Sequence, residues 1–379
     1  MARIIIHRML NLLITLGEVP EFISNLVLLV KTMNRQLHNK RPQNRLLIWC
    51  GRMLLGLLII VIVFAGIGAA YQVIATARAA KDFPPPGTLV DVGGYKMHIF
   101  CSGPQNNGKP TVILDHVGAA NSAQWGLVQP EIAKTTQVCA YDRAGFGWSE
   151  RGPAPRDARQ CMHELHILIN KAGIPGPYIL VGHSYGANVA RLYVAEYPNE
   201  VVGMVLVDPG HLFDTPKVSP ELNTAWKAED QTIMRLAPYL SRLGLMRLAS
   251  ALGATPSHGD LPASGGAAYD AMNLTTQFWD TLSDQNQMMA ATSKEVLATP
   301  QNLGVLPLIV LSASQPADAS RRAWTQVNAE LAARSSNGVH RIADGATHMS
   351  LVLEHEKAQA TIVAILQVIT AAHTGTPLK

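Results

Sequence analysis

Hydrophobic residues are distributed differently in the N-terminal part and in the rest of the chain. Residues 53–77 form an apolar run without a charged side chain, and about 20 such residues suffice to cross the hydrocarbon core of a bilayer. Because the run is apolar on every helical face, it predicts a transmembrane helix rather than a buried core helix. A cleaved signal peptide is the alternative, since Thr76 to Ala80 resembles a small-residue cleavage sequence.

Beyond residue 87 the pattern changes to short apolar runs that alternate with stretches of helical periodicity. Val90 to Met97 alternates around a Gly-Gly pair and predicts an opening hairpin. Strand-like runs follow at 111–114, 177–181, 205–207, 306–312 and 339–343. Residues 210–304 interrupt this rhythm with helical stretches and a Gly-, Ser- and Pro-rich patch, which predicts an inserted helical lid.

The chain is therefore expected to have an α/β fold with a lid and an N-terminal transmembrane helix. The expected boundaries are a basic arm at 1–52, the transmembrane helix at 53–77, a proline-rich linker at 78–87, a core formed by 88–209 and 305–372, the lid at 210–304 and a tail at 373–379.

Charge is concentrated in the N-terminal arm. Residues 1–52 hold eight Lys and Arg against two acids, whereas the whole chain has 31 basic and 27 acidic residues, so the remainder carries 23 − 25 = −2. The positive-inside rule then keeps the arm cytoplasmic and places the core outside the cytoplasm. Residues 9–30 are a candidate interfacial helix rather than a second span, because Glu18, Pro20 and Glu21 interrupt them. The basic charge indicates a membrane surface and not a nucleic acid.

The first candidate catalytic segment is Gly182-His183-Ser184-Tyr185-Gly186, which lies between an apolar run and a helix-like stretch. A strand that turns sharply into a helix through Gly-X-Ser-X-Gly holds its serine out of the sheet beside the first helical amides. The second candidate is His348, in a small-residue loop between the last strand-like run and the last helix. Loops at strand ends carry catalytic groups in α/β folds, so His348 is a candidate general base.

These two motifs, together with Tyr141-Asp142-Arg143-Ala144-Gly145-Phe146-Gly147-Trp148-Ser149, resemble the α/β-hydrolase superfamily from about Thr88 to Leu366. The resemblance implies a mostly parallel eight-stranded sheet flanked by helices, and catalytic residues in the chain order Ser, acid, His. The Asp142–Arg143 pair is expected to fix its own loop through local ion pairing, with a substrate anion site as the alternative. His183, which precedes the nucleophile, is expected to be structural.

The acid of the triad has two main candidates. Asp208 follows the strand after the nucleophile helix, whereas Asp318 lies in the loop after the next strand, from which relatives most often take the acid. Asp318 stands about two residues later than the usual position, so Asp208 is favoured and Asp318 is the alternative. Asp344 is a third and weaker candidate.

The oxyanion hole is expected to combine the amide of Tyr185 with one from the loop at residues 115–121. Relatives usually have a small residue at the start of this loop, but Val117 stands where a glycine is expected and Gly118 follows it. We therefore expect the Gly118 amide to be the second donor, with Val117 as the alternative.

No cofactor or metal is expected, because the histidines and acids lack the spacing of a metal site and no phosphate-binding glycine loop is present. Two cysteines, Cys101 and Cys139, lie on strands that should be neighbours in the implied fold. We expect them to form a disulfide, with two buried thiols as the alternative.

The sequence thus predicts a membrane-anchored serine hydrolase that cleaves a small-molecule ester through an acyl-enzyme. The apolar side chains of the lid favour a substrate with a hydrophobic part. The enzymatic alternatives are an amidase, an aminopeptidase and an acyltransferase. The non-enzymatic alternative is a membrane-anchored binding module without catalytic activity. The sequence does not indicate an oligomeric state.

Overall fold

The computed structural model describes residues 45–105, 108–210, 212–213, 215, 218–254, 257–299 and 302–378. The chain divides into two compact units, residues 1–66 and 67–379. Most of the predicted basic arm, including the candidate interfacial helix at 9–30, lies outside the described residues.

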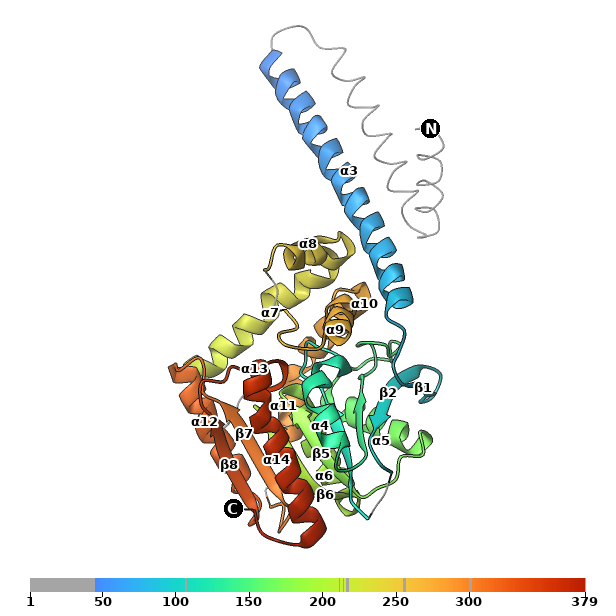
Figure 1. The fold of residues 1–379 in the computed structure, drawn as a ribbon. Coiled ribbons are helices and arrows are strands. Elements are labelled where there is room, and N and C mark those ends of the chain that lie inside the picture. Colours follow the sequence, from blue (N-terminus) through green and yellow to red (C-terminus); the bar gives the residue numbers. More distant parts are fainter. Residues whose placement is uncertain are drawn as a thin grey trace. The chain divides into compact units, whose positions relative to one another are not determined.

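In the part of the second unit that the structure describes, the strands form one eight-stranded sheet with the order β1-β2-β4-β3-β5-β6-β7-β8 (Figure 1). The strands are β1 (Thr88–Asp91), β2 (Lys96–Ser102), β3 (Thr111–Asp115), β4 (Val138–Tyr141), β5 (Tyr178–His183), β6 (Val201–Val207), β7 (Leu308–Ala313) and β8 (Gly338–Ala343). The pairs β1–β2 and β2–β4 are antiparallel, and all other neighbours are parallel. The predicted α/β fold with a mostly parallel eight-stranded sheet is confirmed.

The central strands are buried on both faces, which explains why their sequences are continuous apolar runs. In β5, Ile179 and Val181 contribute to one hydrophobic cluster while Leu180 contributes to the other. The same alternation separates Ile113 from Leu114 on β3. Because successive side chains of a strand point to opposite faces, each strand supplies both cores.

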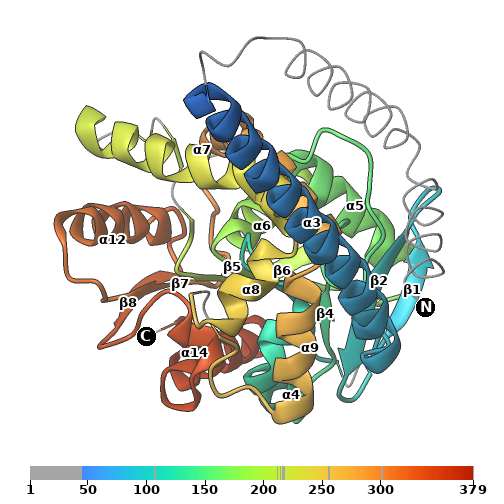
Figure 2. The ribbon, with the colours of Figure 1, turned by 90° about the horizontal axis from the view of Figure 1, so that it is seen from above.

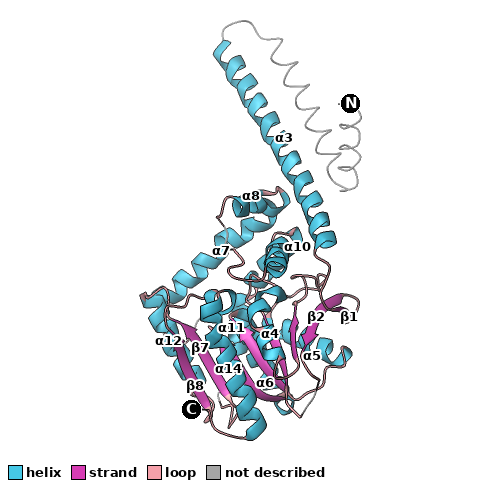
Figure 3. Cartoon of the chain, in the orientation of Figure 1, coloured by secondary structure: helices cyan, strands magenta, loops and turns pink. Residues whose placement is uncertain are grey.

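Helices cover both faces of the sheet (Figure 3). The first core contains residues of α5 (Ala158–Lys171), α6 (Tyr185–Glu196) and α12 (Ala319–Ala332). The second contains residues of α4 (Gln129–Ala133), α13 (Ser350–Leu353) and α14 (His355–Thr374). Short 3₁₀ helices, η2 (Ser122–Leu127) and η3 (Pro198–Glu200), complete the connections.

Among the described residues between β6 and β7, in the stretch predicted to be a lid, there are five helices. They are α7 (Pro220–Arg242), α8 (Leu245–Ala251), α9 (Ala263–Asn273), α10 (Thr276–Gln287) and α11 (Met289–Leu297). Figure 2 shows α7, α8 and α9 above the sheet. This group is called the helical insertion below.

The predicted apolar run lies in one long helix, α3 (Arg45–Asp82). Its segment Ile48–Asp82 is long and apolar enough to cross a membrane by length and composition. The helix extends beyond the predicted boundary at Ala77, so residues 78–82 are helical and the linker prediction is wrong there. Alanines favour the helix at this point, and it ends before Pro84 because the residue preceding a proline disfavours helical geometry.

The predicted pairing of two cysteines is confirmed by a disulfide between Cys101 and Cys139. These residues lie directly opposite each other on the antiparallel strands β2 and β4. Among the described cysteines, Cys50 is exposed and Cys161 is buried, and both are free thiols.

Candidate active site

Ser184 lies at the turn between β5 and α6, in a strained backbone conformation. Its φ of 54° and ψ of −109° lie outside the regions that most residues adopt. The flanking glycines make this turn possible. A Cβ atom at Gly182 would overlap the carbonyl carbon of Gly186, and one at Gly186 would lie 2.7 Å from the Asp115 carbonyl oxygen. The turn therefore requires glycine on both sides of the serine.

The loop after β6 fixes the backbone of the serine from the other side. The Ser184 amide donates to the Val207 carbonyl at 3.0 Å, and the Gly210 amide donates to the Ser184 carbonyl at 3.1 Å. A Cβ atom at Gly210 would lie 3.3 Å from Ser184 Oγ. Gly210 is thus a close neighbour of the hydroxyl, which the sequence analysis did not identify.

Asp208 is hydrogen-bonded to His348, with 2.6 Å between Oδ2 and Nδ1. The carboxylate is 1% exposed and also accepts from Arg321 Nη1 at 2.7 and 2.9 Å and from the Ala313 amide at 3.1 Å. Burial alone would raise the pKa of Asp208, but the hydrogen bond and charge of His348, together with Arg321, lower it to about 2. Asp208 is therefore an anion that can orient the imidazole and stabilise its charge.

The other two carboxylate candidates have different roles. Asp318 caps the N-terminus of α12, where its side chain accepts from the Arg321 amide at 2.7 Å. Asp344 is exposed, and its carbonyl oxygen accepts from Lys357. Of these three aspartates, Asp208 is the one that contacts His348.

His183 supports the loop that carries His348. Its Nε2 atom lies 3.1 Å from the His348 carbonyl oxygen, and the two rings are 4.7 Å apart. Burial, followed by the charge of His348, lowers the pKa of His183 to about 3, so this imidazole is neutral. His348 and Ser184 are not hydrogen-bonded to each other in the described part of the chain, and catalytic hydrogen bonds of free enzymes often form only when substrate binds.

The loop after β3 lies beside the start of α6. Val117 cannot offer its amide to a substrate, because that amide donates to Gln124 Oε1 at 3.2 Å. A Cβ atom at Gly118 would lie 3.6 Å from the Tyr185 Cβ atom. Tyr185 is the first residue of α6, and the first amides of a helix have no intrahelical acceptor. Gly118 and Tyr185 are therefore close together, as an oxyanion hole requires.

Arg143 holds this loop in place from within the protein. Its fully buried guanidinium pairs with Asp115 and donates to the carbonyl oxygens of His116 at 2.7 Å and Val117 at 2.8 Å. Asp142 is equally buried and binds His98 Nδ1 at 2.9 Å. The expected structural role of the Asp142–Arg143 pair is consistent with these contacts, which leave no exposed cation for a substrate.

A side chain from the helical insertion also reaches the Gly118 loop. Gln285 of α10 is buried, its Nε2 atom would lie 3.1 Å from a Cβ atom at Gly118, and its Oε1 atom has no partner among the described residues. Sequence reasoning missed this residue, because a glutamine in a helix carries no motif and its position depends on how the insertion packs.

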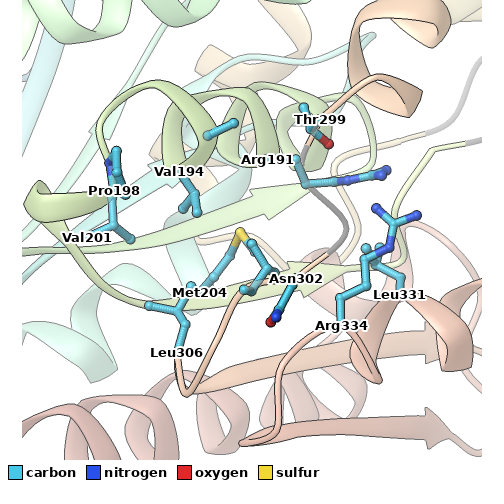
Figure 4. Close-up of a pocket in the computed structure, with 12 residues that line it drawn as sticks. Arg191, Val194, Pro198, Val201, Met204, Thr299, Asn302, Leu306, Leu331 and Arg334 are labelled. Carbon is cyan, nitrogen blue, oxygen red and sulfur yellow. The ribbon is translucent and has the colours of Figure 1, made fainter.

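A cavity of about 270 Å³ lies away from these residues, between α6 and the segment before β7. Figure 4 shows Arg191 and Arg334 extending toward each other at its edge. None of the predicted site residues lines this cavity. Among the described residues, no group of three His, Cys, Asp or Glu side chains is close enough to hold a metal ion.

Comparison with known proteins gives a match to the family described as alpha/beta hydrolase fold over residues 110–301. A human (lyso)-N-acylphosphatidylethanolamine lipase is 31% identical over 110 residues, which are 28% of this chain and 32% of that protein. The chain spans less than two fifths of the length of the curated relatives it matches first.

Solved structures resemble the chain over most of its length. An esterase from Thermogutta terrifontis superposes with a TM-score of 0.56 at 19% identity, covering 76% of this chain and 99% of the esterase. An epoxide hydrolase from Vigna radiata superposes with a TM-score of 0.58 at 16% identity, covering 74% of this chain and 97% of its own. At such identities the likeness establishes the fold alone.

Proposed function

Because the chain belongs to the alpha/beta hydrolase fold family, we propose that it is a serine hydrolase that cleaves an ester through a Ser184–His348–Asp208 triad. The observation that carries this proposal is the contact of the buried Asp208 carboxylate with His348, on a loop held against His183, the neighbour of Ser184. The matched family and the esterase-like fold support hydrolysis as the reaction type.

In the proposed mechanism, Ser184 Oγ attacks the carbonyl carbon of the ester while His348 Nε2 takes the hydroxyl proton. The ester C–O bond breaks, and the alcohol leaves with that proton, so an acyl-enzyme remains. Water then attacks the acyl carbon, His348 takes its proton, and Ser184 leaves with that proton as the acid is released. Asp208 stabilises the imidazolium in both halves of the reaction.

The amides of Gly118 and Tyr185 are the proposed donors to the developing oxyanion. Both lie on backbone that is fixed before substrate arrives, Gly118 by its Arg143-bound loop and Tyr185 by the helix it begins. Preorganised donors of this kind stabilise the negative charge that forms on the carbonyl oxygen in the transition state. A serine at the nucleophile position argues against the epoxide-opening chemistry of some structural neighbours, because relatives of that kind use a carboxylate there.

We also infer that α3 is a single-pass anchor with a cytoplasmic N-terminus and an extracytoplasmic catalytic domain. The length and apolar composition of the helix support the anchor, and the basic excess in residues 1–52 supports the orientation. The Cys101–Cys139 disulfide agrees with an oxidising compartment. The helical insertion would serve as the lid, and its apolar residues favour a substrate with a hydrophobic part.

The proposal is tested with p-nitrophenyl esters of increasing acyl length and with aminoacyl anilides, using the full chain in detergent. We expect turnover of the esters that increases with acyl length up to a limit set by the site, and loss of turnover in Ser184→Ala. Turnover of the anilides in preference to the esters would instead favour an amidase or aminopeptidase. Equal rates for the wild type and Ser184→Ala would contradict the proposed nucleophile.

A further inference from the structure

The end of α7 and the helix α8 expose a cluster of large apolar side chains. This apolar tip consists of Leu236, Tyr239, Leu243, Leu245, Leu248 and Leu252. Tyr239 is 68% exposed and Leu252 is 76% exposed. Residues 236–254 contain no acidic residue and two arginines. Soluble proteins rarely leave so many neighbouring large apolar side chains in water. We therefore expect the tip to be covered by another molecule or by a membrane.

The tip contacts the C-terminal part of α3 within the second unit. A Cβ atom at Gly68 would overlap the Leu243 carbonyl oxygen, and a Cβ atom at Gly244 would lie 2.9 Å from the Gly68 carbonyl oxygen. The two backbones therefore touch through a pair of glycines, which is how small residues allow close helix packing. This contact fixes the apolar tip beside an apolar stretch of α3.

A polar side chain of α3, Gln72, is hydrogen-bonded in the same contact. Gln72 is 1% exposed and donates to the Leu274 carbonyl oxygen at 2.8 Å, while Arg247 Nε donates to Gln72 Oε1 at 2.9 Å. At the other end of the tip, Arg242 forms a bidentate ion pair with Asp280. Both arginines of the tip thus have protein partners, although the Arg242 side chain stays half exposed.

The position of the contact along α3 sets its level relative to a membrane. Trp49 and Tyr71 are exposed aromatic residues 22 positions apart on this helix. A helical segment of 22 residues is about 33 Å long, close to the thickness of a hydrocarbon core. Aromatic residues gather at both membrane interfaces. Tyr71 therefore marks one interface, and Gly68 lies about one turn of helix inside it.

We propose that the apolar tip is inserted into the phospholipid bilayer that α3 crosses, and that the enzyme takes its ester substrate from this bilayer. The second half of this inference rests on the proposed hydrolase function. A bilayer is the occupant that the geometry favours, because the tip is attached by its backbone to the membrane-spanning helix at the level of the interface. The tip would then remain inserted at all times, since no binding step is needed.

The tip is connected to the site through the helical insertion. The helix α7, which ends in the tip, packs along α10, and α10 carries Gln285 beside Gly118. The tip and the proposed oxyanion hole are therefore joined through the packed helices α7 and α10. The substrate class that fits this arrangement is a lipid with an ester bond near its polar end.

Insertion is tested by fluorescence on the full chain in phosphatidylcholine–phosphatidylglycerol liposomes. In a Cys50→Ser background, with Cys161 buried, an environment-sensitive dye is attached to Leu248→Cys or Leu252→Cys. The control is Val363→Cys, an exposed apolar position on α14. We expect blue-shifted emission and quenching by spin-labelled lipid at the tip, with neither effect at the control. Water-like emission at both tip positions would overturn the proposal.

A blue shift that disappears when the protein is diluted in excess lipid would identify a second copy of the chain as the cover, and would also overturn it.

Substrate delivery is tested with the double variant Leu248→Glu, Leu252→Glu. Turnover of a fluorogenic lipid ester within the liposomes should fall roughly tenfold or more, because carboxylates are strongly disfavoured in the hydrocarbon core of the bilayer. Turnover of p-nitrophenyl acetate from water is measured on the same sample and should be retained. This control shows that the variant is folded and that its triad works.

Unchanged turnover of both substrates would refute delivery from the bilayer. If the wild type hydrolyses neither ester, the proposed hydrolase function fails, whereas insertion is still decided by the fluorescence.

Discussion

At the scale of single residues, Asp208 is the buried anion of the proposed site. Its nearly buried carboxylate accepts from His348, Arg321 and the Ala313 amide. An asparagine would keep the volume but remove the charge that stabilises the imidazolium, so we expect kcat to fall by roughly 10³–10⁴ in Asp208→Asn. Asp318→Asn keeps an oxygen that can cap α12 and should leave kcat near the wild-type value.

Steady-state kinetics on p-nitrophenyl esters measures both variants. Similar, near-wild-type rates for Asp208→Asn and Asp318→Asn would show that neither aspartate completes the triad.

The same carboxylate makes a pH-dependent contribution to stability. Its pKa is lower in the folded protein, about 2, than the usual 3.8. The stabilisation is therefore complete above about pH 4 and is lost as the pH falls toward 2, with a total of about 2 kcal/mol. Thermal unfolding in detergent at pH 5 and pH 2.5 should show a smaller loss of midpoint in Asp208→Asn than in the wild type. An identical loss in both proteins would contradict the assigned environment.

The identification of single residues from sequence was uneven for a physical reason. Ser184 and its glycines form a local motif, because the strained turn needs all of them within five positions. The contact of Asp208 with His348 joins positions 140 residues apart, and the sequence left Asp318 open because both aspartates follow a parallel strand. Gln285 and Gly210 depend entirely on how distant segments pack, and no pattern in the sequence indicates them.

At the scale of elements, Gly68 is the glycine on α3 that allows the close contact with the helical insertion. A side chain at Gly68 would overlap the Leu243 backbone, whereas a Cβ atom at Gly66 has nothing within 4 Å. Alanine raises helix propensity by about 1 kcal/mol at either position. We therefore expect Gly66→Ala to be neutral or stabilising, and Gly68→Ala to separate the insertion from α3.

Limited trypsin digestion at Arg247 measures this difference on protein extracted into detergent, away from the bilayer, because separation from Gln72 frees the Arg247 side chain. Cleavage should be several times faster in Gly68→Ala than in Gly66→Ala. Equal cleavage rates would mean that the contact does not hold the insertion.

The elements themselves were largely predictable, since strands buried on both faces read as apolar runs, and residues 53–77 of α3 form a charge-free apolar segment. The end of α3 was placed at Ala77 because the prediction followed hydropathy, whereas helical geometry continues through the alanines to Asp82.

At the scale of the whole molecule, the proposed anchor and the disulfide lead to one expectation about compartment. A Cys101–Cys139 bridge persists where the catalytic domain is outside the reducing cytoplasm. Membrane-extracted protein, denatured without reductant, should show the two thiols of Cys50 and Cys161, and four thiols after reduction. Four thiols before reduction would contradict the proposed extracytoplasmic location.

The proposed function requires Ser184 to be an activated nucleophile, which labelling with a fluorophosphonate probe detects. Folded full-length protein in detergent should form one adduct, located by mass spectrometry on the peptide that contains Ser184. The adduct should be absent in Ser184→Ala and form far more slowly in His348→Gln. If the wild type, with its disulfide intact and a cooperative thermal transition, forms no adduct at Ser184, the account of a serine hydrolase is contradicted, and a non-catalytic membrane-anchored binding module becomes the better explanation.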